Sequence, residues 1–195
     1  MDPEFPVRKK NRLRSHDYSN PGFYFVTICT QIRKENVLCA IIPPPDAACA
    51  IVGAAALGGP LVPCTAPVIS AAGPCERPKI VLTSAGEVVA RYIQNIDHAY
   101  YGRIIVDHGV IMPDHVHLII RICSLEDGPP RAAAPTVALS NVINALKGLT
   151  TKALGYSLWQ RGYYDHVIRN GADLYRIRKY IEENPLKWSI SEGGF

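Results

Sequence analysis

Short apolar runs bounded by turn-forming residues predict several strands. Residues 22–30 read GFYFVTICT, a run rich in aromatic and β-branched side chains that follows Asn20-Pro21, and residues 79–83 (KIVLT) form a shorter run of the same kind. Two further apolar runs, residues 103–112 and 115–123, flank Pro113-Asp114 and are too short for helices. This arrangement predicts two adjacent strands of an antiparallel hairpin.

Three other segments carry apolar residues at the spacing of helices that bury one face. The first starts at Ser84, which forms a capping box with Glu87, and its apolar positions are Val88, Val89, Tyr92, Ile93 and Ile96. The second is capped near Ser140, with inner positions Val142, Ile143, Leu146, Leu149 and Leu154. The third follows Gly171 with Asp173 as its cap, and Pro185 is predicted to end it at Asn184. Together these elements predict a mixed α+β fold with an antiparallel sheet.

Residues 40–78 differ from the rest of the chain in composition. Asp46 is the one charged residue between positions 40 and 75, and the stretch from Pro43 to Pro78 holds eight of the 16 prolines. Its length and lack of charge also suit a membrane span, but the prolines, the glycines and the scarcity of large apolar side chains argue against that reading. We therefore interpret residues 40–78 as a Pro/Ala/Gly-rich insertion within a single domain of residues 6–195.

The composition indicates the class of protein and its cellular compartment. The 195 residues are 48% hydrophobic and 19% charged, with a net charge of +4, which is typical of a soluble globular protein. The six cysteines form no CxxC pair and no signal peptide is evident, so a reducing cytoplasm is expected. We interpret residues 1–5 (MDPEF) as the remnant of an expression vector.

Positive charge is concentrated in two places, although the net charge is small. Residues 8–14 (RKKNRLR) form a basic arm suited to phosphate, with the charged residues Arg8, Lys9, Lys10, Arg12 and Arg14. Residues 159–188 interleave basic and aromatic residues, the combination that holds single-stranded nucleic acid. The candidates for DNA contact in this second stretch are Arg161, Tyr163, Tyr164, His166 and Arg169. About half of the aromatic and basic residues in the stretch are instead expected in the core or on a solvated helix face.

Two pairs of residues could carry chemistry. His115 and His117 are two apart in a predicted strand and therefore share one face, where two imidazoles can bind one metal ion or simply form a polar surface. Tyr180 and Asn184 are four apart on the last helix and share a side beside the apolar stripe formed by Leu174, Ile177 and Ile181. From the helix alone, a plain structural role is favoured, with Tyr180 covering the core and Asn184 ending the helix.

Three blocks of the sequence, residues 8–31, 109–120 and 159–188, carry a family resemblance. They contain the motifs PDHVH, WQRGYYDH and YIEENP in this order. In these blocks the chain resembles the HUH-type single-strand DNA transposases of the IS200-like group, and in particular the REP-associated tyrosine transposases. The resemblance covers most of the chain outside residues 40–78, where the chain departs from the family.

The resemblance implies a fold, a reaction and a set of partners. The fold is a ferredoxin-like antiparallel sheet with helices packed on one face, His-x-His on a central strand and the nucleophile on a C-terminal helix. Tyr180 matches the nucleophile, and His115, His117 and Asn184 match the ligands of Mg²⁺ or Mn²⁺. The implied activity is metal-dependent cleavage and rejoining of single-stranded DNA at or near hairpins through a covalent phosphotyrosine. A bacterial, nucleoid-associated protein that acts as a monomer or a homodimer, away from membranes, is expected.

Two other functions fit the same residues. A non-catalytic module could bind single-stranded nucleic acid through the same basic and aromatic side chains. A metal-dependent nuclease could use water in place of Tyr180, and His-x-His would serve it equally well. His166 or Asp165 could assist a tyrosine nucleophile, but the sequence does not decide between them. No Walker-type phosphate loop occurs, which argues against ATP-driven chemistry.

Overall fold

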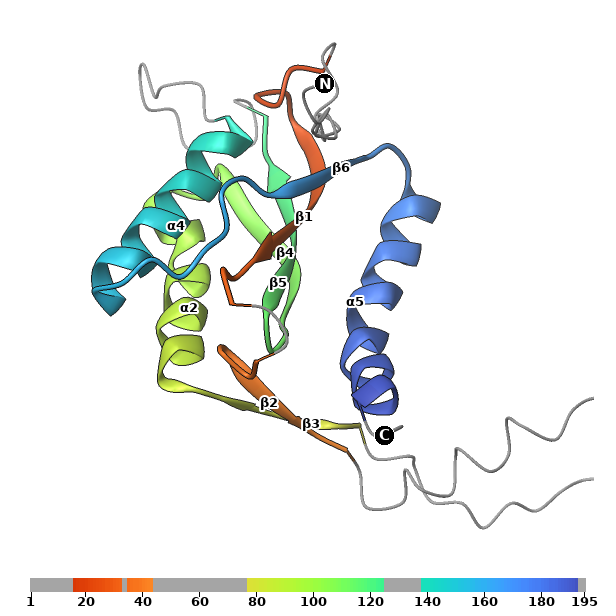
Figure 1. Cartoon of the computed structure of the whole chain (residues 1–195). Coiled ribbons are helices and arrows are strands. Elements are labelled where there is room, and N and C mark those ends of the chain that lie inside the picture. Colours follow the sequence, from red (N-terminus) through yellow and green to blue (C-terminus); the bar gives the residue numbers. More distant parts are fainter. Residues whose placement is uncertain (1–15, 33–34, 44–76, 125–137, 193–195) are drawn as a thin grey trace, which may run out of the picture.

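The computed structural model describes residues 16–32, 35–43, 77–124 and 138–192, and they contain a four-stranded antiparallel sheet (Figure 1). The strand order is β4-β5-β1-β6. The bounds are Gly22–Cys29 for β1, Ile104–Ile111 for β4, His115–Ile122 for β5 and Tyr164–Ile168 for β6. The strand with the two histidines, β5, therefore lies inside the sheet between β4 and β1, as the family resemblance implied.

Helices cover both faces of this sheet. On one face lie α2 (Ser84–Gln94) and α4 (Leu139–Leu154), with the short α3 (Ile96–Ala99) following α2, whereas α5 (Gly171–Glu192) lies across the other face (Figure 1). The mixed α+β class and the antiparallel sheet are confirmed. The expected packing of helices on one face holds for α2 and α4 but not for α5, whose buried isoleucines contact the opposite side of the sheet.

The alternation of side chains along the strands creates two cores of unequal size. Even-numbered residues of β1 and β5, such as Val26 and Leu118, are buried under α2 and α4 in the larger core. The odd-numbered side chains point to α5, where Ile119 of β5 joins the smaller cluster formed by Ile168, Ile177 and Ile181. The smaller cluster holds α5 against the face on which the two histidines lie.

A second, two-stranded sheet pairs β2 (Cys39–Ile42) with β3 (Lys79–Leu82). Its antiparallel register joins Cys39 to Leu82 and Ile42 to Lys79. The first residues of the segment interpreted as an insertion, 40–42, thus belong to a strand, and its end directly precedes β3. Residues 44–76 of that segment, the basic arm at 8–14 and residues 1–5 lie outside the described residues.

Several predicted helix boundaries change in the structure. Thr83, not Ser84, caps α2: its side chain accepts a hydrogen bond from the Gly86 backbone N–H and donates to the Val37 carbonyl oxygen at 2.7 Å. Helix α4 begins after Ala138, without a side-chain cap. Leu149, predicted to be buried, is 48% exposed, because the inner face of α4 is formed by Val142, Ile143, Leu146 and Thr150.

Pro185 does not end the last helix, which continues to Glu192. The predicted end at Asn184 was wrong because contacts on both sides of the proline hold the helical path. Lys187 forms an ion pair with Glu183 at 2.9 Å across the proline, and the Trp188 ring reaches the sheet. The predicted cap also differs, since Asn170 Oδ1 accepts a hydrogen bond from the Asp173 backbone N–H at 2.8 Å.

No helix within residues 16–32, 35–43, 77–124 and 138–192 is both long and apolar enough to cross a bilayer.

Two helical glycines provide a matched test of this packing. A Cβ at Gly86 would lie 1.9 Å from the Leu38 carbonyl oxygen, whereas a Cβ at Gly148 meets no atom within 4 Å. We expect Gly86→Ala to lower the free energy of unfolding by roughly 1–3 kcal/mol or more through overpacking. Gly148→Ala should raise it by roughly 0.5–1 kcal/mol because alanine favours the helix. Urea denaturation measures both, and equal effects of the two substitutions would contradict the close approach of α2 to residue 38.

Candidate active site

The two histidines of β5 point to the α5 side of the sheet with their rings close together. His115 Nε2 lies 3.1 Å from His117 Nε2, and the ring centroids are 4.5 Å apart. His117 is 4% exposed, and His115 is partly buried. The prediction that both imidazoles share one strand face is therefore confirmed, and their Nε2 atoms converge on one point.

The other nitrogen of each ring has its own partner. His115 Nδ1 lies 2.6 Å from Asp114 Oδ1, and His117 Nδ1 lies 2.8 Å from the Thr27 hydroxyl of β1. Because a carboxylate accepts hydrogen bonds, a neutral His115 ring in this contact carries its proton on Nδ1 and leaves a lone pair on Nε2. A hydroxyl can donate or accept, so the Thr27 contact permits His117 to place its Nε2 proton toward His115, or to present a second lone pair.

Burial keeps His117 uncharged at neutral pH. Desolvation, together with the nearby His115, lowers the pKa of His117 from 6.5 to about 3, and the carboxylate of Asp114 only partly opposes this. A neutral imidazole is the form that binds a metal ion. The buried His117 ring can therefore bind a metal ion at neutral pH without first losing a proton.

Helix α5 places three side chains over the histidine pair at intervals of four residues. The Tyr180 ring centroid lies 5.4 Å from that of His117, and the Trp188 centroid lies 5.9 Å from that of His115. Asn184 is midway between Tyr180 and Trp188 on the same helix face. Because each of its two neighbours on that face contacts one histidine, Asn184 faces the pair.

Asn184 is 9% exposed, and its amide is not fully satisfied. Within the described part of the chain, no group hydrogen-bonds to its Nδ2 atom. A buried amide without a partner is costly and therefore points to a further group at this position. The oxygen and nitrogen of an Asn amide are exchanged by a simple flip, so the orphaned position also suits the oxygen.

Few contacts set the position of Tyr180. Its ring is 42% exposed and packs edge-on against Phe25, with centroids 6.1 Å apart at 90°. Lys187 Nζ lies 5.7 Å from the ring centroid. The tyrosine thus has one side against the sheet beside His117 and another open to solvent, as an approaching substrate would require.

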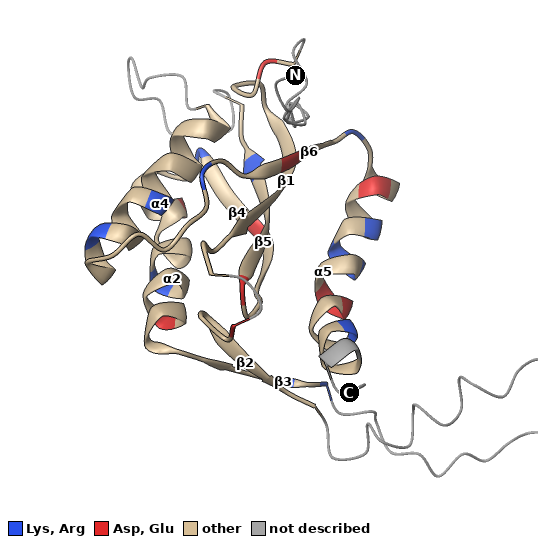
Figure 2. Cartoon of the chain, in the orientation of Figure 1, with Lys and Arg blue, Asp and Glu red and all other residues tan. Residues whose placement is uncertain are grey.

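Ion pairs fasten α5 at both edges of the sheet. Arg178 pairs with Asp107 of β4 through two hydrogen bonds, and near the start of the helix Asp173 bonds His166 of β6 at 2.9 Å. Figure 2 shows charges of both signs along α5. These contacts, with the isoleucine cluster between them, fix the height of Tyr180 above the histidines.

The donor set fits a divalent ion. Two nitrogens about 2.1 Å from one ion and at a right angle to each other are about 3.0 Å apart, close to the 3.1 Å between the two Nε2 atoms. Hydrogen bonds from the second nitrogens to a carboxylate and a hydroxyl are typical of metal-bound histidines. No group of three His, Cys, Asp or Glu side chains suited to a metal occurs in the described ranges. The Asn184 amide is a further donor of another type that faces the two histidines.

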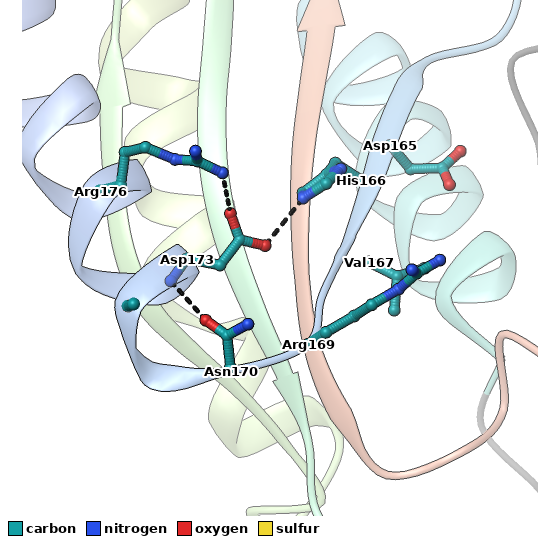
Figure 3. A pocket seen from close by; sticks show the side chains of 8 residues that line it. Asp165, His166, Val167, Arg169, Asn170, Asp173 and Arg176 are labelled. Atoms are coloured by element: carbon teal, nitrogen blue, oxygen red, sulfur yellow. Dashed lines mark hydrogen bonds and ion pairs between the residues drawn. The ribbon is translucent and has the colours of Figure 1, made fainter.

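The residues predicted to contact DNA differ in their burial and in their partners. Tyr163 packs against the large core, whereas Tyr164 is 52% exposed. Arg161 and Arg169 are exposed, and His166 pairs with Asp173. Asp165 projects from the side of β6 opposite to His166 (Figure 3). The described contacts therefore bring neither His166 nor Asp165, the two suggested helpers of the nucleophile, to Tyr180.

Sequence reasoning missed three residues of this site. Thr27 could be found only from the register that pairs it with His117. Asp114 was visible as the residue before His115, a position from which a carboxylate reaches the ring. Trp188 continues the four-residue spacing of Tyr180 and Asn184, but the predicted end of the helix at Asn184 hid that signal.

A family model and two proteins of one organism share sequence with this chain. The family model described as "Transposase IS200 like" matches residues 72–184. An uncharacterized protein of Haemophilus influenzae is 26% identical over 93% of this chain and 89% of its own length. A second protein of the same organism, provisionally named a REP-associated tyrosine transposase, is 27% identical over 60% of this chain and 68% of its own length.

A solved structure shares the fold. The structure of a REP-associated tyrosine transposase bound to a REP hairpin superposes with a TM-score of 0.54 and 18% identity. The match covers 90% of this chain and 73% of the other. The family model extends over more than half of the chain and includes β5 and most of α5. The chain therefore belongs to the IS200-like transposase family.

Proposed function

We propose that this protein is a metal-dependent single-stranded DNA endonuclease and strand transferase that cleaves at or near DNA hairpins through a covalent phosphotyrosine. The observation that carries the proposal is the position of the Tyr180 ring, 5.4 Å from the ring of His117 and on the helix face that also presents Asn184. Nucleophile and ligand set then meet at one point, as in-line attack on a bound phosphate requires.

His115, His117 and Asn184 would hold Mg²⁺ or Mn²⁺. When bound, the ion would act as a Lewis acid that offsets the negative charge developing on the phosphate oxygens. Asp114 and Thr27 orient the two imidazoles through their Nδ1 atoms. Phe25 packs against the His117 ring and Trp188 against the His115 ring, and these contacts limit the access of water.

Tyr180 would attack the scissile phosphorus through its phenolic oxygen. A bond forms between this oxygen and phosphorus as the phenol releases its proton to solvent. The bond from phosphorus to the 3′ oxygen breaks, and the leaving oxygen takes up a proton from solvent to become a 3′ hydroxyl. The DNA then remains joined to the protein through its 5′ phosphate. Attack of a 3′ hydroxyl on this ester restores the strand without ATP, because the phosphodiester energy is retained.

A hairpin substrate is supported by the related solved structure, which holds a REP hairpin. The basic arm of Arg8, Lys9, Lys10, Arg12 and Arg14 offers five positive charges for its phosphates. Single-stranded DNA beside the hairpin would reach the open side of the Tyr180 ring.

The nucleophile is tested by Tyr180→Phe, with Tyr175→Phe as the matched control on the same helix. Tyr175 is 70% exposed and lines the hollow on the β4 side of α5, away from the histidines. With Mn²⁺ and labelled hairpin DNA from the flanks of the gene, wild type and Tyr175→Phe should form a denaturant-stable adduct on a gel. Tyr180→Phe should bind the DNA and form none. Cleavage without an adduct in every variant would instead support a nuclease that uses water.

The ligand set is tested by Asn184→Ala, with Glu183→Ala as the control. Glu183 is the neighbouring acidic residue, and its carboxylate pairs with Lys187 and Lys179 rather than with the histidines. We expect Asn184→Ala to weaken Mn²⁺ binding by roughly tenfold or more, since a loss within the coordination environment typically costs that much. Glu183→Ala should leave it unchanged. Isothermal titration with Mn²⁺ measures both, and equal affinities for the wild type and Asn184→Ala would remove Asn184 from the set.

A further inference from the structure

The edge strand β4 contains a β-bulge at Asp107. Its register with β5 shifts between Val106 and His108, so Asp107 is an extra residue in the ladder. Before the bulge, Val106 packs against the large core under α2 and α4. After it, Val110 packs against the small cluster under α5. The bulge therefore changes which side chains of β4 face α5, and it turns both Asp107 and His108 toward that helix.

Contacts on either side of the bulge hold β4 in this path. Before the bulge, Asp97 Oδ1 of α3 accepts a hydrogen bond from the Val106 backbone N–H at 3.0 Å. After it, Gly109 lies so close to β5 that a Cβ would be 2.7 Å from Leu118 Cδ2 and 3.1 Å from the His117 carbonyl oxygen. Glycine marks such close approaches of one strand to another. The bulge is thus fixed relative to the strand that carries the histidines.

The bulge brings two adjacent side chains to α5. Arg178 donates two hydrogen bonds to Asp107, from Nε to Oδ2 at 2.8 Å and from Nη2 to Oδ1. This is the two-pronged contact that a guanidinium forms with a carboxylate. The next residue, His108, has its Nε2 atom 3.7 Å from Glu182 Oε1. Because Arg178 and Glu182 are one turn apart, two successive residues of the strand contact two successive turns of the helix.

The apolar contact leaves one motion of α5 free. Ile177 and Ile181 pack against the sheet, but apolar contacts have no preferred direction and allow the helix to roll about its axis. Tyr180 and Arg178 are about 200° apart around the helix, so they flank the isoleucines on opposite sides. A roll of about 10° moves a group about 6 Å from the axis by roughly 1 Å. A displacement of that size can slow a reaction about a hundredfold.

We propose that the Asp107–Arg178 pair sets the roll of α5, and that these two residues are positioning residues for the Tyr180 nucleophile. Two parallel hydrogen bonds between planar groups fix an angle as well as a distance. The Arg178 side chain is 43% exposed, and partly exposed pairs add little to stability, so the effect of the pair is on orientation. This inference rests on the proposed function and assigns the bulge of β4 a part in placing the nucleophile.

The rate of adduct formation in a single turnover, at saturating hairpin DNA and Mn²⁺, separates placement of the nucleophile from binding. Arg178→Ala and Asp107→Ala should each slow this step about tenfold to a hundredfold, while the Kd for DNA and the midpoint of urea unfolding change little. The double variant should be no slower than either single variant, because each removes the same contact. Arg178→Lys should stay slow, since one ammonium group fixes no angle.

Arg176→Ala is the matched control. Arg176 also pairs with an aspartate, but its partner Asp173 lies on α5 itself. Loss of this pair removes an arginine from the same helix without removing a contact to β4. The rate of adduct formation at saturating DNA should therefore equal that of the wild type.

Ring contacts measure the placement of Tyr180 without DNA, metal or activity. The Tyr180 ring packs edge-on against Phe25 and lies beside His117. Ring-labelled wild-type protein should therefore give nuclear Overhauser contacts from Tyr180 to both rings. Arg178→Ala should weaken these contacts at least twofold, whereas Arg176→Ala should leave them at wild-type strength.

Four results decide the inference. If Arg178→Ala forms the adduct as fast as the wild type, the pair does not set the roll and the proposed function stands. If Arg178→Ala loses affinity for DNA but keeps its rate at saturation, Arg178 is a DNA contact and the inference fails. A wild-type rate in Arg178→Lys would show that charge alone suffices and would also overturn it. If the wild type forms no adduct, the proposed function fails, and the ring contacts decide alone: equal contacts in the wild type and Arg178→Ala refute the positioning role, and weaker contacts in the variant support it.

Discussion

The site depends on how α5 docks on one face of the sheet. The contact is small: Ile177 and Ile181 of the helix pack against Ile119 of β5 and Ile168 of β6. Full burial of such a side chain is worth about 1.5–3 kcal/mol, so a few residues hold the element that carries Tyr180. The Arg178–Asp107 and Asp173–His166 pairs help to orient the helix but contribute little to stability, since each pair has an exposed partner. The height of the tyrosine above the histidines follows from these contacts.

The two histidine rings lie close together in a buried position, and the groups around them set their orientation. Two facing Nε2 atoms repel unless a proton or a cation lies between them, and desolvation keeps the pKa of His117 near 3. Asp114 and Thr27 orient the rings toward each other despite this, and the Nδ2 atom of Asn184 is left buried without a described partner. A buried amide nitrogen without a described partner beside two buried imidazoles is typical of a site that takes up a further ligand.

The sequence predicted the strands β1, β3, β4 and β5, the shared face of the two histidines and the shared side of Tyr180 and Asn184, because those depend on local periodicity. It did not predict β2 or β6. It failed where distant contacts override local preference. Pro185 would end an isolated helix, but Trp188 beyond it contacts His115 and the helix continues. Leu149 has helical spacing yet is exposed, since the width of the buried face depends on what packs against it. Thr27 entered the site only through strand register. The predicted single domain and the role of residues 40–78 stay predictions.

The central claim is that α5 presents Tyr180, and no other tyrosine, to a phosphate held at the histidine pair. Mass spectrometry of the wild-type protein after reaction with hairpin DNA and nuclease trimming tests it directly. The account predicts a nucleotide remnant on the peptide that contains Tyr180, with fragmentation assigning it to that residue and not to Tyr175. A remnant on Tyr164, on Tyr175 or on any other residue would contradict the account.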